Sequence, residues 1–324
     1  MINLYVDISI LAIAFIIDIV FCEPPPKIHP VVWIGKVIGF LDRYCHCGKP
    51  LIEKFRGCLM ALLSIFLASI ATLVILEFSR YFLGIYGYVL VSALILKTMF
   101  GFRSMREHVV PIIDACKLGD MKRAREMLSK VVRRDVWKLD DNQVISAAIE
   151  TIAEGTVDGV TSTLFYYGLF GVIGAVVQRV VNTLDSIVGY KDEYYRNVGW
   201  FSAKLDTIFN FVPARVTALI IALSALVLGK NYRDSFRIAL HDHKRTESIN
   251  AGWPMAAMAG ALDVQLEKPG HYKLGIPRRK LTPELIYNAL HIMYLSTILF
   301  IMLIVIPTLI ICNAIFEYFF RCLI

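Results

Sequence analysis

Three carboxylates recur every four residues in the segment IETIAEGTVDGVTS (149–162): Glu150, Glu154 and Asp158. On a helix of 3.6 residues per turn this spacing places them along one face, where like charges repel. The chain then becomes the uncharged apolar run TLFYYGLFGVIGAVV. Acids beside an apolar helix are tolerable when a divalent cation lies between them, and Mg²⁺ prefers carboxylate oxygens. The spacing therefore favours a metal-binding acidic face.

Two further segments pair acids with amides. NTLDSIVGYKDEYY places Asn182 and Asp185 one helical turn apart, and KLDTIFNFVPAR places Asp206 four residues before Asn210. Oxygen ligands of this kind suit Mg²⁺, which typically takes one or two carboxylates together with substrate phosphates.

Basic residues dominate elsewhere. His243, Lys244 and Arg245 stand together in HDHKRTESINAGWPMAAMAGAL, and Arg215 precedes an apolar run. Guanidinium and ammonium groups suit phosphate. With the acidic clusters they favour Mg²⁺-assisted chemistry on a phosphorylated substrate. Each cluster taken singly also has a non-catalytic explanation, because charged residues often mark where a helix leaves a bilayer.

The elements that must position these residues are those of a membrane protein. Of 324 residues, 57% are hydrophobic and 19% charged, and the mean hydropathy of +0.60 exceeds that of soluble domains. The first apolar run lacks a small-residue cleavage site, so we expect it to be retained. The net charge of +7 is assigned to cytoplasmic loops rather than to a nucleic-acid partner.

Cysteine and histidine give weaker signals. Seven scattered cysteines, an odd number, predict no disulfide framework. Cys45-His46-Cys47 could be half of a metal site, but zinc motifs usually have two intervening residues and a second ligand pair, which this sequence lacks. His29, before Pro30, is interpreted as a loop residue rather than a ligand.

Hydropathy predicts an all-α polytopic membrane protein with about four spanning helices. Runs near the roughly 20 residues that a span needs lie at 4–21, 58–77, 81–100 and 294–316. Two shorter runs, 163–177 and 216–229, have the length of re-entrant or buried helices. No alternating β pattern, G-x-G-x-x-G or Walker A sequence is present, which argues against a Rossmann domain or a P-loop.

The positive-inside rule orients the chain. The connections 22–57, 101–160 and 230–293 are rich in Lys and Arg, which places all three in the cytoplasm. If both short runs cross the bilayer, 182–208 lies outside; if both dip in and return, it stays inside.

We treat 1–324 as a single membrane-embedded domain, with 101–160 as a cytoplasmic helical insert and 230–293 as a cytoplasmic polar segment. The insert is expected to contain two short amphipathic helices broken at Gly119-Asp120, with Asp120 capping the second.

Five segments resemble, in order, the signature blocks of the CobD/CbiB family, the adenosylcobinamide-phosphate synthases of cobalamin biosynthesis. They are HPVVWIG, AAIETIAEGTVDGVTSTLFY, NTLDSIVGYK, KLDTIFNFVPAR and NAGWPMAAMAGAL. The resemblance implies a membrane ligase that joins a propionate carboxylate of adenosylcobyric acid to the amine of aminopropanol or its O-phosphate, using ATP and Mg²⁺. Gly155, Thr163 and Ile249 stand where the family usually has Asn, Pro and Pro. The first departure removes an amide ligand.

The resemblance and the residues agree on mechanism class, since a carboxylate must be activated, through an acyl phosphate, before an amine attacks it. The expected Mg²⁺ ligands are Glu154, Asp158 and Asp185, then Glu150 and Asp206. The expected substrate- and phosphate-binding residues are Lys244, Arg245, Arg215, Asn182 and Asn250. His243 is expected to act as base for the incoming ammonium, and Glu154 and Asp158 to be catalytic.

ATP and the corrinoid are expected on the cytoplasmic side of the cell membrane, which favours the re-entrant arrangement of 163–177 and 216–229. The expected partners are the corrinoid, aminopropanol or its phosphate, the lipid bilayer and other cobalamin-pathway enzymes. Two alternatives stay open. A transporter would line its path with intramembrane acids, although no internal repeat is found. A non-catalytic scaffold would hold pathway enzymes at the bilayer.

Overall fold

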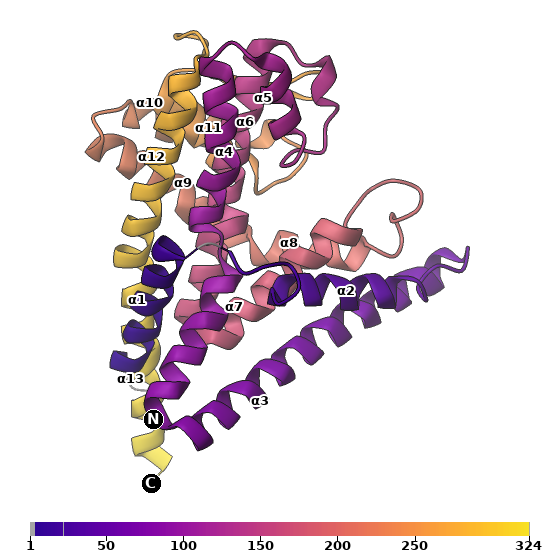
Figure 1. The fold of residues 1–324 in the computed structure, drawn as a ribbon, viewed down its shortest axis with the longest axis vertical. Coiled ribbons are helices and arrows are strands. Elements are labelled where there is room, and N and C mark those ends of the chain that lie inside the picture. The colour runs from indigo at the N-terminus through magenta and orange to yellow at the C-terminus, as the bar shows by residue number, and fades with distance from the viewer. Residues whose placement is uncertain (1–3, 22, 324) are drawn as a thin grey trace. The chain divides into compact units, whose positions relative to one another are not determined.

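The computed structural model of the chain describes residues 4–21 and 23–323, with side-chain surroundings up to residue 318 (Figure 1). The chain forms two compact units, each built from segments far apart in sequence. The first unit comprises Met1–Gly101, Ser162–Phe209 and Met302–Ile324, and the second unit comprises Phe102–Thr161 and Asn210–Ile301. The expected insert 101–160, apart from Gly101, and the polar segment 230–293 thus belong to the second unit.

The first unit is helical. Its elements are α1 (Leu4–Val20), α2 (Pro30–Asp42), α3 (Pro50–Met99), α7 (Ser162–Val188), α8 (Trp200–Phe209) and α13 (Ile306–Leu323). Pro30 and Pro50 open α2 and α3, where a missing N–H leaves no helical hydrogen bond unmade. The loop residue His29 caps α2, because its Nδ1 accepts from the Val31 N–H at 3.2 Å.

Two of these helices contain a glycine break. α3 is interrupted at Gly84 (φ +66°), near the expected boundary between the runs 58–77 and 81–100. α7 is interrupted at Gly171 (φ +62°) but continues to Val188, well beyond the predicted run 163–177. The apolar run ends before the helix does. Beyond the run, the helix carries polar side chains that form hydrogen bonds within the first unit. Thr163 Oγ1 donates to Gln178 Oε1 at 2.6 Å, and Arg179 Nε donates to the Met99 carbonyl at 2.5 Å.

Among the residues that the structure describes, three helices are long and apolar enough to cross a membrane: Pro50–Lys117, Asp141–Val188 and Pro283–Tyr318. A fourth is counted if α8 and α9 (Phe211–Val227), bent by 43° at a short break, form one broken span; the same geometry also fits a re-entrant loop. These lengths and compositions are those of membrane-spanning helices. The re-entrant arrangement stays a prediction.

The second unit packs helices around an apolar core. Its elements are α4 (Phe102–Lys117), α5 (Met121–Leu128), η1 (Val136–Lys138), α6 (Asp141–Thr156), η2 (Val157–Thr161), α9, α10 (Tyr232–Asp242), η3 (His243–Arg245), α11 (Gly252–Leu262), β1 (Gln265–Lys268), β2 (Tyr272–Gly275) and α12 (Pro283–Phe300), followed by η4 (Ile301–Val305) at the boundary. Buried side chains of α4, α5, α6, α9, α11 and α12 share this core.

The helix break in the insert is confirmed, and one element was missed. Gly119 adopts φ +73°, and the Asp120 side chain accepts from the Arg123 N–H to cap α5. The antiparallel hairpin of β1 and β2 corrects the all-α prediction locally. Each strand has only four residues, too short for alternation to stand out, although Leu266 and Leu274 are paired and buried.

Gly260 of α11 approaches α10 so closely that a larger residue does not fit. A Cβ there would lie 2.3 Å from the Asp234 carbonyl oxygen. Replacing Gly260 by alanine is expected to lower the free energy of unfolding by about 1–3 kcal/mol, measured by thermal unfolding in detergent. Gly39→Ala in α2, where an added Cβ meets nothing within 4 Å, is the control and is expected to be neutral or stabilising. Equal losses in both variants would contradict the close-contact explanation.

Candidate functional site

Arg215 belongs to a cluster of four side chains in the second unit. Its Nη1 donates to the Phe211 carbonyl at 2.6 Å and to Asn250 Oδ1 at 2.9 Å. The guanidinium carbon lies 3.5 Å from the centroid of the Phe211 ring and 5.3 Å from that of Trp253. The ring of His243 stacks on Trp253 with centroids 4.0 Å apart. The sequence-predicted residues Arg215, His243 and Asn250 therefore meet around Trp253, and we call these four residues the Arg215 cluster.

Local sequence explains why the cluster forms. A Cβ on Gly252 would lie 2.1 Å from the His243 carbonyl oxygen, so glycine is needed where α11 begins against η3. The next residue, Trp253, is thereby held beside His243. Its indole Nε1 is buried and has no hydrogen-bond partner among the described residues. Buried donors are normally satisfied, so this N–H is an exception that a bound ligand or water would satisfy.

The hydrogen bond made by His243 sets its tautomer. Nδ1 lies 2.9 Å from the Ala239 carbonyl oxygen, which can only accept, so Nδ1 carries the proton. In the neutral ring the lone pair is then on Nε2. This is the arrangement that a general base acting through Nε2 requires.

The two predicted phosphate-binding residues that follow His243, Lys244 and Arg245, differ in their surroundings. Lys244 is exposed. Arg245, also exposed, pairs with Asp242 at 3.2 Å and donates to the Lys273 carbonyl at 3.2 Å. Asp242 is buried and also accepts from the Gly275 N–H at 2.8 Å, so Arg245 helps fix η3 to β2. Phosphate binding by these two residues stays a prediction.

Glu150 lies at the centre of a buried network. Its carboxylate accepts from Arg134 Nη2 at 2.5 Å, Ser146 Oγ at 2.7 Å and the Tyr272 hydroxyl at 2.9 Å. Burial, followed by the charge of Glu150, holds the pKa of Tyr272 well above its usual value. About three of the four acceptor positions of the carboxylate are therefore used within the protein. The network joins α6 to the hairpin and leaves Glu150 little capacity for a metal.

Glu154 and Asp158, the other two acids of the segment 149–162, have different surroundings. Glu154 is exposed on α6, whereas Asp158 is half-buried in η2, a π-helical turn. The three acids therefore have different exposure, and the common face expected from their spacing stays a prediction. Thr161 fixes this turn to α9, since its Oγ1 lies 2.7 Å from Thr217 Oγ1. Such turns occur frequently at functional sites.

The remaining predicted ligands lie in the first unit. Asn182 on α7 accepts from Arg179 Nη1 at 3.1 Å. The Asp185 side chain lies close to Gly189, since a Cβ added to this glycine would be 2.0 Å from Asp185 Oδ1. Asp206 lies on α8, which packs against α7. The five expected metal carboxylates are thus divided between the two units.

No group of three or more His, Cys, Asp or Glu side chains among the described residues is arranged to hold a metal ion. Mg²⁺ needs only one or two carboxylates when substrate phosphates complete its shell. Glu154 and Asp158, which lie in the same unit as the Arg215 cluster, fit such a donor set. Their Mg²⁺ role stays a prediction, as do those of Asp185 and Asp206.

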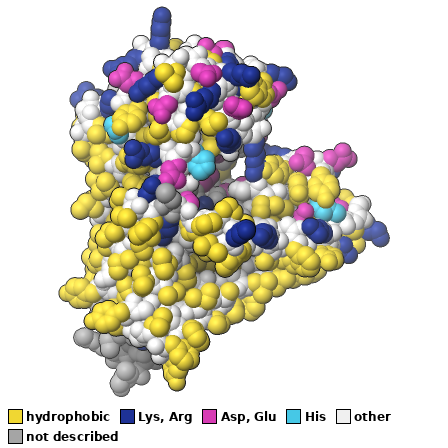
Figure 2. Space-filling model, in the orientation of Figure 1, with side chains coloured by type: hydrophobic (Ala, Val, Ile, Leu, Met, Phe, Trp, Pro, Cys, Tyr) yellow, Lys and Arg dark blue, Asp and Glu magenta, His cyan; other side chains and the backbone are white. Residues whose placement is uncertain are grey.

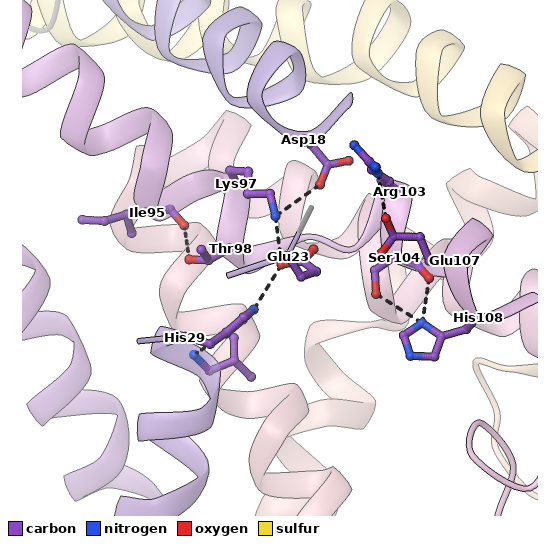
Figure 3. Close-up of polar contacts among 11 residues, drawn as sticks. Asp18, Glu23, His29, Ile95, Lys97, Thr98, Arg103, Ser104, Glu107 and His108 are labelled. Atoms are coloured by element: carbon purple, nitrogen blue, oxygen red, sulfur yellow. Dashed lines mark hydrogen bonds and ion pairs between the residues drawn. The ribbon is translucent and has the colours of Figure 1, made fainter. Parts of the chain in front are cut away.

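Sequence reasoning missed a buried ionic cluster in the first unit (Figure 3). Lys97 Nζ lies 2.9 Å from Glu23 and 3.9 Å from the fully buried Asp18, and His29 Nε2 lies 3.2 Å from Glu23. Burial raises the pKa of Glu23, but the hydrogen bonds from His29 and Lys97 outweigh it and hold that pKa below its usual value. The available signal was the presence of Asp18 and Lys97 inside apolar runs, where charges are costly unless paired.

The Cys45-His46-Cys47 motif is structural. The Cys45 thiol is buried and donates to the Leu41 carbonyl at 3.5 Å. His46 lies 3.1 Å from Asp42 and stacks on Tyr194 with centroids 4.0 Å apart.

Comparison with known proteins identifies the family. A family model described as CobD/Cbib protein matches residues 11–315. A "Probable cobalamin biosynthesis protein CobD" of Methanothermobacter thermautotrophicus is 40% identical over 91% of this chain and 95% of its own. One of Thermoplasma volcanium is 41% identical over 94% and 98%, and the "Cobalamin biosynthesis protein CobD" of Dehalococcoides mccartyi is 38% identical over 86% and 89%. No solved structure matches. The resemblance read from the sequence is confirmed, and the chain belongs to the CobD/CbiB family.

Proposed function

We propose that this protein acts in cobalamin biosynthesis as an ATP-dependent ligase. It would join a propionate carboxylate of adenosylcobyric acid to the amine of aminopropanol or its O-phosphate. Relatives that share about 40% of their residues carry the name cobalamin biosynthesis protein. The observation that carries the proposal is the Arg215 cluster, because it places a fixed guanidinium, an imidazole and a buried indole N–H without a partner among the described residues together.

The reaction divides into two displacements. A carboxylate oxygen attacks the γ-phosphorus of ATP, which forms an acyl phosphate and releases ADP. The amine nitrogen then attacks the acyl carbon, the carbon–oxygen bond to phosphate breaks, and inorganic phosphate leaves with the electron pair. An ammonium is not nucleophilic, so one proton must first be removed from it, and a second is lost as the amide forms.

The residues of the Arg215 cluster match these needs. Arg215 is held by two hydrogen bonds and lies over Phe211, so its remaining N–H groups are oriented in advance toward a phosphoryl group. His243, with its lone pair on Nε2, would take the proton from the ammonium. Glu154 and Asp158 would hold Mg²⁺, which supplies neutralising charge to the phosphates when bound.

Arg215→Lys tests the proposal. Lysine keeps the positive charge but loses the planar fork, so kcat/KM for amide formation is expected to fall about 10²-fold. The assay uses protein in nanodiscs with adenosylcobyric acid, aminopropanol phosphate, ATP and Mg²⁺, and detects the amide by mass spectrometry. Arg233→Lys is the matched control, since Arg233 also lies over an aromatic ring, that of Tyr232, in the same unit.

The outcomes separate the alternatives. Amide from wild type and from Arg233→Lys, with little from a folded Arg215→Lys, supports the ligase and its site. Equal activity in all three would remove Arg215 from the site. No amide from folded wild type with every substrate present would overturn the ligase and favour a scaffold or a transporter.

A further inference from the structure

One face of α2 is exposed and apolar. Trp33, Val37 and Phe40 follow helical spacing, and their exposed fractions are 51%, 39% and 56%; Tyr44, just beyond the helix end, is 64% exposed. The opposite face packs on α3 and α7, and there Ile38 is fully buried. A helix with one face on the protein and an aromatic, aliphatic face outward is typical of helices that lie in the membrane interface.

A groove opens beside this face. A cavity of about 390 Å³ between α2 and α3 is lined almost wholly by apolar side chains, among them Trp33, Ile34, Val37, Leu67, Ala71 and Ile75. Leu67 and Ile75 are also 45% and 49% exposed on α3, which is long and apolar enough to span a bilayer. The groove is thus continuous with an exposed apolar surface of α3, and Figure 2 shows hydrophobic side chains along α3.

The exposed charge of the segment 24–56, which includes α2, has one sign. Between residues 24 and 56 the exposed cations are Lys27, Lys36, Arg43, Lys49, Lys54 and Arg56. The only acids in this segment, Asp42 and Glu53, are both buried. Asp42 contacts His46, and Glu53 accepts from the backbone of Cys47 and Gly48. The segment therefore presents positive charge without an exposed acid, and Lys and Arg side chains lie along α2 in Figure 2.

Two of these cations are linked to residues that line the cavity, one through the chain and one through a backbone hydrogen bond. Lys36 directly precedes Val37, which lines the cavity. Trp33, also in the lining, donates its indole N–H to the Lys27 carbonyl at 2.8 Å, which holds the Lys27 backbone at the start of α2. An apolar groove beside a helix that carries exposed cations matches a lipid with apolar chains and an anionic headgroup.

We propose that the groove between α2 and α3 binds an anionic phospholipid of the surrounding bilayer. One acyl chain occupies the groove, and the headgroup phosphate lies against Lys27 and Lys36. This site is separate from the reaction proposed above, so its test does not depend on catalysis. It gives α2 a role in fixing the first unit at a membrane surface that carries anionic lipid.

Quenching of Trp33 fluorescence by brominated lipid tests this proposal. Full-length protein is placed in phosphatidylcholine nanodiscs in which a fixed share of lipid is brominated on its acyl chains, as either phosphatidylglycerol or phosphatidylcholine. The contribution of Trp33 is the difference between wild type and Trp33→Phe. Brominated phosphatidylglycerol is expected to quench Trp33 at least about twofold more than brominated phosphatidylcholine, because the cations enrich the anionic lipid in the groove.

Charge-removing variants identify the source of the preference. Lys27→Gln with Lys36→Gln should abolish the excess quenching by phosphatidylglycerol. The control pair Lys122→Gln and Lys130→Gln, two exposed lysines in the second unit, should preserve it. Equal quenching by the two lipids in wild type, or no quenching of Trp33 by either, would overturn the proposal. So would a preference that survives in the Lys27/Lys36 variant.

Discussion

Asp158→Asn is expected to reduce amide formation by about 10³-fold or more while the protein stays folded. Asparagine matches aspartate in size and keeps a carbonyl oxygen, so the π turn that holds residue 158 should survive. What disappears is the negative charge, which a Mg²⁺ ion needs from the few carboxylates that hold it. The measurement is the nanodisc assay described above, run beside thermal unfolding.

Asp141→Asn provides the comparison for this variant. Asp141 begins α6, the helix that leads into the π turn, and its side chain is 66% exposed in an ion pair with Arg125. Loss of an exposed ion pair has little effect, so activity and stability should both stay near wild type. If a folded Asp158→Asn protein forms amide at the wild-type rate, Asp158 has no catalytic or metal-binding role.

The all-α, apolar character of the chain was predictable because hydropathy alone carries it, whereas the limits of the helices were not. The run 163–177 ends where Gln178 and Arg179 begin, yet α7 continues because those side chains bond to Thr163 and to the Met99 carbonyl. A hydropathy window along the chain cannot detect a hydrogen-bond partner that is distant in sequence. The same reason hides the ion pair of Glu23 with Lys97, whose members are separated by more than seventy residues.

Residue chemistry was enough to predict which kinds of residue form the candidate site. It did not predict that the candidate metal ligands are divided between the two units. Arg215, His243 and Asn250 were chosen because guanidinium, imidazole and amide suit phosphate and proton transfer, and they do meet. Trp253 joins them, and residue chemistry does not select it, because an indole ring is not a typical phosphate- or proton-transfer group. Four-residue spacing implied a regular helix through Asp158, but the π turn depends on contacts with α9 that spacing does not encode.

Spacing also suggested that Glu150 and Glu154 are alike, and the structure separates them sharply. Glu150 is 2% exposed and bonded to Arg134, whereas Glu154 is exposed one turn later. Replacing Glu150 by alanine is expected to lower the free energy of unfolding by about 3–5 kcal/mol, because it leaves a buried guanidinium without its counter-charge. Arg134 Nη1 already has no partner among the described residues, so little else could compensate.

Glu154→Ala is the matched control for this loss, since it removes the same side chain from the same helix at an exposed position. It should change the free energy of unfolding by less than about 0.5 kcal/mol. Thermal unfolding in detergent compares the two variants with Glu150→Met/Arg134→Met, which replaces the buried pair by apolar side chains. The double variant should regain most of the lost stability, because apolar packing can substitute for a buried ion pair when neither charge is left alone. If Glu150→Ala and Glu154→Ala unfold at the same temperature, the Glu150 network does not stabilise the second unit, and the carboxylate becomes free for the metal role that its bonds to Arg134 and Tyr272 now argue against.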